Sequence, residues 1–184
     1  MALITRRSML LAAGGTLAVG LVARKSWGEE LPDIASVLDL TNPPVAAPDI
    51  TFVSVDGAEH HLKEFVGHGM VINLWATWCA PCVAEMPSLA ALSKTLAPDD
   101  IAVLPLSSDR GGANVVRAFY QQNGIASLPV LLDPKGAAAR AWRVRGVPTS
   151  VIIDRKGRER ARVEGAADWS TPTAAATVRK LVAV

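Results

Sequence analysis

Trp75-Ala76-Thr77-Trp78-Cys79-Ala80-Pro81-Cys82 is the stretch that decides the fold prediction, and it holds the only two cysteines of the 184-residue chain. An apolar run at residues 70–74 precedes it, which is typical of a buried strand. After it, apolar residues recur at steps of three and four through residues 83–92, the spacing of a helix. Two cysteines where a buried strand meets a helix are typical of a redox-active dithiol.

Three interpretations of Cys79 and Cys82 compete. A structural zinc site needs four ligands, but there is no second cysteine pair, and the three histidines lie together upstream at residues 60–68. A purely structural disulfide would add little stability, because the loop that it closes is short. In a reversible dithiol, Cys79 would face the unpaired N–H groups and the positive dipole end of the helix, which favour its thiolate. The sequence therefore favours redox chemistry.

The motif at residues 78–82 resembles the active site of thioredoxins, and the longer run at residues 73–87 resembles the TlpA/ResA branch of that superfamily. Members of this branch are membrane-tethered or periplasmic thiol–disulfide oxidoreductases. The resemblance runs from about residue 50 to the C-terminus. It implies a thioredoxin-like α/β fold, in which helices flank a central mixed β-sheet. It also implies an N-terminal β-hairpin and the extra helix–strand segment that TlpA-type proteins share with peroxiredoxins.

Local patterns place the elements of this fold. Asp56-Gly57 predicts a hairpin turn, and Thr171-Pro172 predicts the start of the last helix. Strands are predicted at residues 50–55, 59–62, 70–74, 101–106, 128–132, 150–153 and 159–163, and helices at residues 79–97, 113–123, 137–142 and from 171 onward.

Both cysteines take part in the predicted reaction. Cys79, at the helix start, is the attacking thiolate that forms a mixed disulfide with the substrate, and Cys82, one turn on and more buried, resolves it. By resemblance, Ala80 and Pro81 tune the relative stability of dithiol and disulfide. Pro81 is tolerated in the first turn because the N–H that it lacks would have no partner there. The redox-active disulfide between Cys79 and Cys82 is expected to carry the electrons, and no cofactor or metal is expected.

The predicted proton carrier departs from the thioredoxin pattern. Thioredoxins have an aspartate six residues before the first active-site cysteine, where this chain has Asn73, which cannot exchange a proton near neutral pH. Glu85 lies three residues after Cys82, on the same helix face, and the TlpA/ResA resemblance includes it. Partial burial among apolar neighbours would raise the pKa of Glu85 and let it carry the proton of Cys82. The alternative is a solvated glutamate on the helix surface.

Further site residues come from the resemblance. Pro148 resembles the cis-proline that faces the cysteine pair in thioredoxin-like folds, and Val147 before it would offer its backbone to an extended substrate peptide. Thr149 is assigned a supporting role. Trp78 is expected beside the exposed sulfur, whereas Trp75 is expected in the core.

The N-terminus predicts export. An arginine pair, Arg6-Arg7, precedes an apolar stretch at residues 10–23, which is short for a membrane span. Residues 1–28 are therefore predicted to be a twin-arginine signal peptide or an uncleaved anchor that associates with the membrane. Residues 29–48 contain four prolines and are predicted to be a Pro-rich linker. The thioredoxin-like domain is assigned to residues 49–184.

The charge distribution excludes one class of partner. Residues 1–28 contribute four of the 19 basic residues and none of the 17 acidic ones, so the remainder is slightly acidic. Without a basic arm or a basic stripe interleaved with aromatic residues there is no case for nucleic-acid binding, and we expect a monomer. A short basic ribbon is interpreted as a charged hairpin at a sheet edge, with an acidic docking partner as the alternative; it consists of Arg155, Lys156, Arg158, Arg160 and Arg162.

The predicted function is a periplasmic disulfide reductase for exported proteins. By resemblance, its clients are apocytochrome c cysteines or copper-site cysteines of oxidase assembly factors, and a membrane thiol–disulfide transporter donates the electrons. Alternatives are a disulfide-forming oxidase, an antioxidant thiol peroxidase, and a copper-binding assembly module with Cys79, Cys82 and a histidine as ligands. The motif does not match the Thr-x-x-Cys pocket of such peroxidases, and Pro148 near the cysteines argues against metal.

Overall fold

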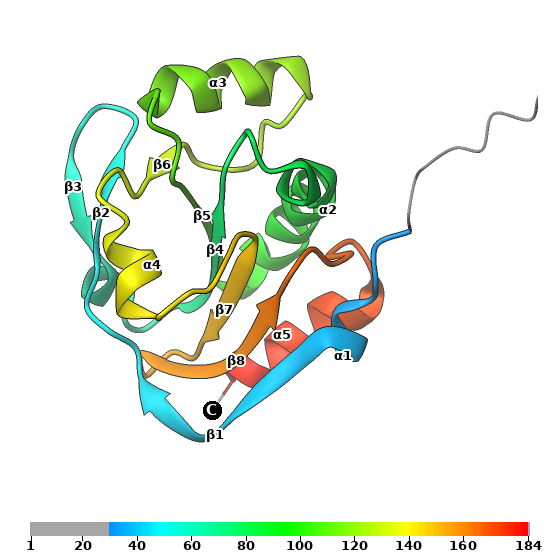
Figure 1. Ribbon diagram of the computed structural model, residues 1–184. Coiled ribbons are helices and arrows are strands. Elements are labelled where there is room, and N and C mark those ends of the chain that lie inside the picture. Colours follow the sequence, from blue (N-terminus) through cyan, green and yellow to red (C-terminus); the bar gives the residue numbers. More distant parts are fainter. Residues whose placement is uncertain (1–29, 184) are drawn as a thin grey trace, which may run out of the picture.

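The sheet organises the molecule around β4 (Gly69–Trp75). The computed structural model describes residues 30–183, so the predicted signal or anchor at residues 1–28 lies outside the described part. Eight strands form one mixed sheet in the order β1-β8-β7-β4-β5-β6-β2-β3, with helices on both faces (Figure 1). The remaining strands are β1 (Leu38–Ala46), β2 (Thr51–Ser54), β3 (Glu59–His61), β5 (Ile101–Ser107), β6 (Leu131–Leu132), β7 (Thr149–Ile153) and β8 (Arg158–Glu164). The helices are α1 (Ile34–Val37), α2 (Ala80–Leu96), α3 (Gly112–Gln122), α4 (Ala137–Ala141) and α5 (Pro172–Val182), with short 3-10 turns η1 (Leu62–Phe65) and η2 (Ala97–Asp99).

Every residue of β4 is buried, because β4 lies between parallel β5 and antiparallel β7 and both its faces are covered. Its side chains alternate between two apolar cores. Val71 and Trp75 belong to the core under α2, α3 and α5, and Ile72 and Leu74 to the core under α4 and the β2–β3 hairpin. Asn73 falls on the α2 side by the same alternation, so a polar side chain lies beneath the helix that starts at the cysteines.

The helix starts predicted at Cys79 and at Thr171 are confirmed. Cys79 is the N-cap of α2, with Pro81 in the first turn. Thr171 caps α5, since its hydroxyl oxygen accepts a hydrogen bond of 3.0 Å from the backbone N–H of Ala174. The strand predicted at residues 128–132 is shorter than expected, because only Leu131–Leu132 pairs with its neighbours.

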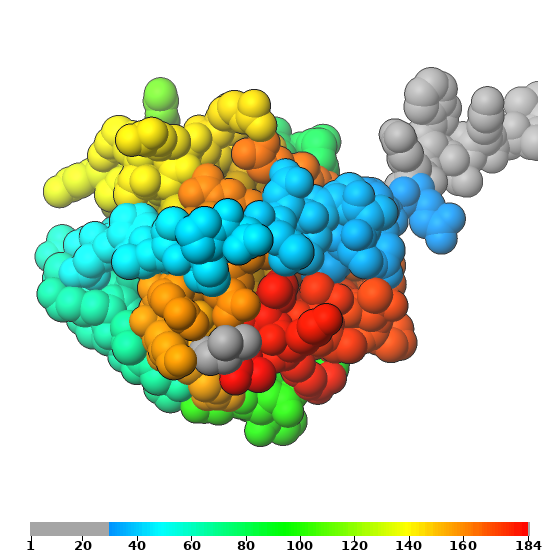
Figure 2. Space-filling view, turned by 90° about the horizontal axis from the view of Figure 1, so that it is seen from below, coloured from blue at the N-terminus to red at the C-terminus, as the bar shows by residue number. Residues whose placement is uncertain are grey.

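The prediction of a linker at residues 29–48 is wrong. Asp33 caps α1, Ile34 is fully buried in the core, and β1 pairs antiparallel with β8. Figure 2 shows β1 as a band across the surface, alongside the C-terminal helix. The folded unit therefore begins near residue 33, ahead of the predicted boundary at residue 49.

The prolines that suggested a linker lie where β1 does not pair. The register with β8 holds at Leu38–Leu40, breaks, and resumes at Val45. Pro43 and Pro44 lie in this interruption. Proline cannot donate a backbone hydrogen bond, so it is tolerated in an outermost strand at such a break. The same residues that resemble a linker in sequence thus form an irregular edge strand.

The basic ribbon is not at a sheet edge, because β1 covers the outer side of β8. Three of its arginines pair with buried carboxylates. Arg158 and Arg160 contact Asp154 at 2.8 and 3.4 Å, and Arg162 contacts Glu159 at 2.6 Å. These ion pairs account for much of the ribbon without a docking partner.

The described helices are also too short or too polar for a membrane span: within residues 30–183, none combines the length and apolar character that crossing a bilayer requires.

The role of the N-terminal segment can be tested by truncating one buried side chain. Ile34→Ala should lower the free energy of unfolding by about 3 kcal/mol, because a fully buried isoleucine leaves a cavity behind. Leu40→Ala in β1 is the matched control: its side chain is 66% exposed, so the loss should stay below about 0.5 kcal/mol. Denaturant unfolding of both variants measures this, and equal, negligible losses would restore the linker interpretation.

Candidate active site

The two cysteines lie at the start of α2, just beyond the C-terminal end of β4, and form a disulfide. Cys79 keeps 7% of its surface exposed and Cys82 none. Cys79 is therefore the sulfur that a partner reaches first. Ala80 and Pro81 between them are exposed.

The helix start is built to favour a thiolate at Cys79. Its sulfur accepts a hydrogen bond of 3.3 Å from the backbone N–H of Cys82, in the position of an N-cap side chain. After reduction, the same N–H and the positive end of the α2 dipole would stabilise the negative charge of the Cys79 sulfur.

The loop before β7 forms the opposite wall of the site. The Val147–Pro148 peptide bond is cis, and the Val147 carbonyl oxygen lies 3.5 Å from the sulfur of Cys79. Thr149 is buried, and its hydroxyl donates to the Gly146 carbonyl at 2.7 Å, so it supports this loop from within. Trp78 stands 69% exposed beside Cys79.

Glu85 is fully buried, so the surface alternative for this residue is wrong. Its carboxylate accepts three hydrogen bonds. Asn73 Nδ2 donates to Oε1 at 2.8 Å, and the Ala167 backbone N–H and Trp169 Nε1 donate to Oε2 at 3.1 and 3.3 Å. The carboxylate thus lies between β4, α2 and the segment that follows β8.

Burial raises the pKa of Glu85 from 4.5 to about 7, although the donors from Asn73, Ala167 and Trp169 oppose the shift. Loss of hydration destabilises the charged form more than three neutral donors stabilise it. Among residues 30–183, no ion pair includes Glu85. A carboxyl group poised near neutral pH one turn after Cys82 is suited to exchange a proton with it.

Sequence reasoning missed most partners of Glu85. Trp169 and Ala167 are far away along the chain, and no local pattern points to them. Asn73 offered a signal, because a polar residue inside an otherwise apolar central strand must find a buried partner.

Sequence reasoning also missed Asp109, whose hydrogen bonds fix the loop before Cys79. The Asp109 carboxylate accepts from the Thr77 backbone N–H at 2.9 Å and from the Thr77 hydroxyl at 2.7 Å. The backbone N–H of Ser108 donates a hydrogen bond of 3.0 Å to the carbonyl oxygen of Trp75. The loop that follows β5 therefore positions the chain that leads into the cysteines.

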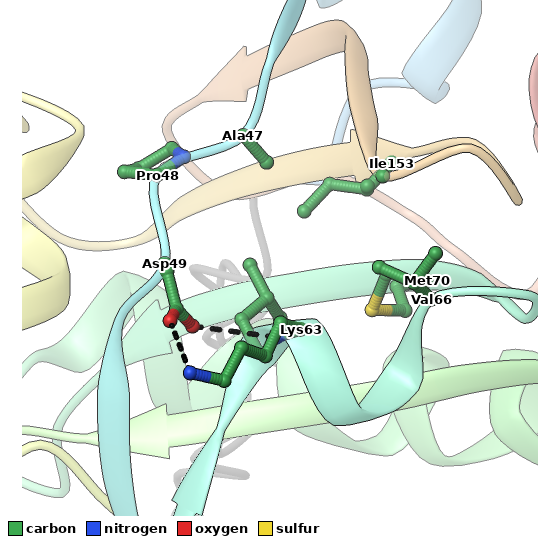
Figure 3. Close-up of a pocket in the computed structure, with 9 residues that line it drawn as sticks. Ala47, Pro48, Asp49, Lys63, Val66, Met70 and Ile153 are labelled. Carbon is green, nitrogen blue, oxygen red and sulfur yellow. Dashed lines mark hydrogen bonds and ion pairs between the residues drawn. The ribbon is translucent and has the colours of Figure 1, made fainter.

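Other features lie away from the sulfurs. A cavity of about 70 Å³ lies at the opposite end of β4, near Met70, with an ion pair of 3.2 Å between Asp49 and Lys63 at its rim (Figure 3). It holds water-sized molecules at most.

Among residues 30–183, no three His, Cys, Asp or Glu side chains are grouped to hold a metal ion. His60 contacts Glu64 instead, at 3.4 Å.

Residues 44–161 match the model of a family described as the AhpC/TSA family. The chain belongs to this family. It is similar to thioredoxin-like protein YneN of Bacillus subtilis, at 36% identity over 60% of this chain and 65% of that protein. It is similar to thiol-disulfide oxidoreductase ResA of Bacillus thuringiensis subsp. konkukian, at 30% identity over 65% of this chain and 68% of that protein. Both matches span about two thirds of the relative.

The fold is shared with solved structures. The exposed lipoprotein thioredoxin Etrx1 of Streptococcus pneumoniae superposes with a TM-score of 0.58 at 27% identity, over 73% of this chain and 100% of that chain. The predicted thioredoxin-like fold is confirmed. With the disulfide at the start of α2, these matches identify the chain as a ResA-like thiol–disulfide oxidoreductase.

The raised pKa of Glu85 makes stability depend on pH. Between pH 4.5 and about 7 the folded protein retains a proton that the unfolded chain has released, so the free energy of unfolding falls as pH rises through this window. The full loss is about 3 kcal/mol. Glu85→Gln, which has no charge to bury, should lack this fall and be more stable than the wild type above pH 7.

Denaturant unfolding of the disulfide form across this pH range measures the difference. Glu64→Gln, at an exposed position, is the control and should follow the wild-type profile. Parallel profiles for wild type and Glu85→Gln would show that Glu85 does not titrate in this window.

Proposed function

We propose that the Cys79/Cys82 dithiol reduces disulfides of exported proteins and that Glu85 carries the proton of the resolving cysteine. One observation carries this proposal: a fully buried carboxyl group with a pKa near 7 lies one helical turn after Cys82. A disulfide with a purely structural role has no use for a titrating buried acid beside it, because such a group lowers stability above pH 7.

The first step uses Cys79. Its thiolate attacks one sulfur of the client disulfide, a Cys79–client bond forms, and the client's own S–S bond breaks. The departing client sulfur leaves as a thiolate and takes a proton from solvent.

The second step uses Cys82 and Glu85. The ionised carboxylate of Glu85 accepts the proton of the Cys82 thiol, and the resulting thiolate attacks Cys79. The mixed disulfide breaks and the second client sulfur leaves. Two electrons have passed to the client, and Cys79 and Cys82 are again joined. Glu85 then releases its proton, and a dithiol donor reduces the pair for the next cycle.

The wall opposite the sulfurs supports a peptide client. The partly exposed Val147 presents backbone beside Cys79, so an extended client segment would pair with it as a short strand over Pro148. The exposed indole of Trp78 would pack against such a segment, while Thr149 supports the loop.

The compartment and partners are part of the same proposal. The arginine pair ahead of residues 10–23 supports twin-arginine export to the periplasm, with a cleaved signal or a retained anchor, and the name of Etrx1 describes that protein as an exposed lipoprotein. Apocytochrome c or copper-site cysteines are the proposed clients, a membrane thiol–disulfide transporter is the proposed electron donor, and a monomer is the proposed oligomeric state.

A residue before the motif favours reductase over peroxidase chemistry. Ala76 stands three residues before Cys79, where Thr-x-x-Cys peroxidases have threonine.

The reduction potential separates a reductase from a disulfide-forming oxidase. Equilibrating the protein in graded thiol buffers should give a value near or below about −200 mV, towards the roughly −270 mV of thioredoxin. A value near roughly −120 mV would make the protein a disulfide donor instead. Absence of a reversible couple would point back to a structural disulfide.

Single cysteine variants test the division of labour. Cys82→Ser should accumulate a mixed disulfide with a reducible client protein, because nothing resolves the bond to Cys79. Cys79→Ser should form little or none, since Cys82 is buried. Non-reducing gel electrophoresis after acid quenching reads out both. Trapping by Cys79→Ser alone would reverse the assigned roles.

The proton carrier is tested by the rate of resolution. Glu85→Gln should slow decay of the mixed disulfide about 10²-fold near pH 7, the lower range for general base catalysis. Formation of the mixed disulfide should be nearly unchanged, because Cys79 performs it. Rapid-quench kinetics separates the two steps, and an unaltered resolution rate would remove Glu85 from the mechanism.

A further inference from the structure

Asn73 makes an unusually one-sided set of hydrogen bonds. It is fully buried, and its amide nitrogen Nδ2 donates both to Glu85 Oε1 at 2.8 Å and to Ser150 Oγ at 3.0 Å. Its amide oxygen Oδ1 is buried and has no hydrogen-bond partner. A buried amide oxygen without a partner is costly, and it calls for an explanation.

A half-turn of the amide group would exchange its paired and unpaired atoms. Nitrogen and oxygen of an asparagine amide have nearly the same shape, so rotation exchanges them with little displacement of other atoms. Oδ1 would then face Glu85 Oε1 and Ser150 Oγ. The serine hydroxyl can rotate to donate to it, whereas Glu85 can donate only when it is protonated.

The other contacts of Glu85 decide which oxygen takes that proton. Oε2 already accepts from the backbone N–H of Ala167 and from Nε1 of Trp169, and both are groups that can only donate. A proton on Oε2 would face these donors. The proton therefore belongs on Oε1, the oxygen that faces Asn73.

We propose that Asn73 is a positioning residue that follows the protonation state of Glu85: its amide donates to the carboxylate, and after a half-turn it accepts from the carboxylic acid. Ser150 follows by rotating its hydroxyl. Each state keeps two hydrogen bonds around Asn73 and leaves one amide atom unpaired. Asn73 thus keeps a hydrogen bond to Glu85 in both protonation states, as a carrier that works in both directions requires.

The surroundings leave Glu85 as the group that drives this rotation. Asn73 from β4, Ser150 from β7, and Ala167 and Trp169 after β8 are neutral. Asp168, between the last two, is partly exposed, and its carboxylate is bound by the backbone N–H of Ser170 at 2.9 Å. On α2 itself, Cys82 does not titrate while it is in the disulfide. In the reduced protein the Cys82 thiol joins Glu85 as a titrating neighbour.

The rotation can be observed in the full-length oxidised protein by NMR. The nuclear Overhauser contact between the Asn73 side-chain NH2 and the β protons of Ser150 should be strong at high pH and weaken at least about threefold at low pH, because rotation carries the nitrogen away. Its midpoint should coincide with the titration of the Glu85 carboxyl carbon. A contact that stays constant while Glu85 titrates overturns the proposal.

Glu85→Gln provides a matched variant. Its amide places an N–H donor where protonated Oε1 would be, provided that its oxygen keeps the donors of Ala167 and Trp169. Asn73 should then be locked in the rotated orientation, with the weak Ser150 contact at every pH. A strong contact at all pH values in this variant contradicts the inference.

Kinetics connects the rotation to turnover, and this part rests on the proposed function. Asn73→Leu removes both hydrogen-bonding modes and should slow resolution of the mixed disulfide about tenfold and move its pH profile. A slower rate with an unmoved pH profile would reveal a merely structural role. Failure of the proposed function and failure of this inference give different results. If Glu85 carries no proton in the reaction, Glu85→Gln resolves the mixed disulfide at the wild-type rate, while the Overhauser contact of Asn73 still changes with pH in the wild type. If Asn73 does not rotate, that contact stays constant, while Glu85→Gln still slows resolution.

Discussion

The hydrogen bond between Asn73 and Glu85 joins the central strand to the active-site helix, and the site depends on it. Asn73 comes from the middle of β4 and Glu85 from the second turn of α2, so the bond of 2.8 Å sets how the helix start sits on the sheet. Because both groups are fully buried, neither has water as an alternative partner. The placement of α2 on the sheet follows from this pairing and from the apolar packing around it.

The chemistry of the site arises from a balance in which burial outweighs three hydrogen-bond donors. Three donors favour the charged form of Glu85, and loss of hydration disfavours it, with the outcome a pKa of about 7. A cationic partner would have kept the group ionised, and an apolar surrounding without donors would have kept it protonated. Neutral donors in a dry site leave the carboxyl group able to move a proton in either direction near neutral pH.

The two sides of the sheet divide structural and chemical roles. The core under α4 and the β2–β3 hairpin is apolar, whereas the core under α2 combines apolar packing with the cysteines and the buried polar network. The outer strand β1 covers β8. The buried carboxylates of Asp154 and Glu159 form ion pairs with arginines of β8 beneath it.

Local sequence patterns were enough to identify the strand–cysteine–helix unit and the fold that these residues imply, and they predict that Cys79 attacks and Cys82 resolves. Those features are local, because periodicity and helix-start chemistry act over a few residues. The three-dimensional structure was needed to show that residues 33–46 belong to the fold and that Glu85 is bound by groups 82 and 84 positions away. Partners so distant leave no periodic signal, and a Pro-rich edge strand has the same composition as a linker.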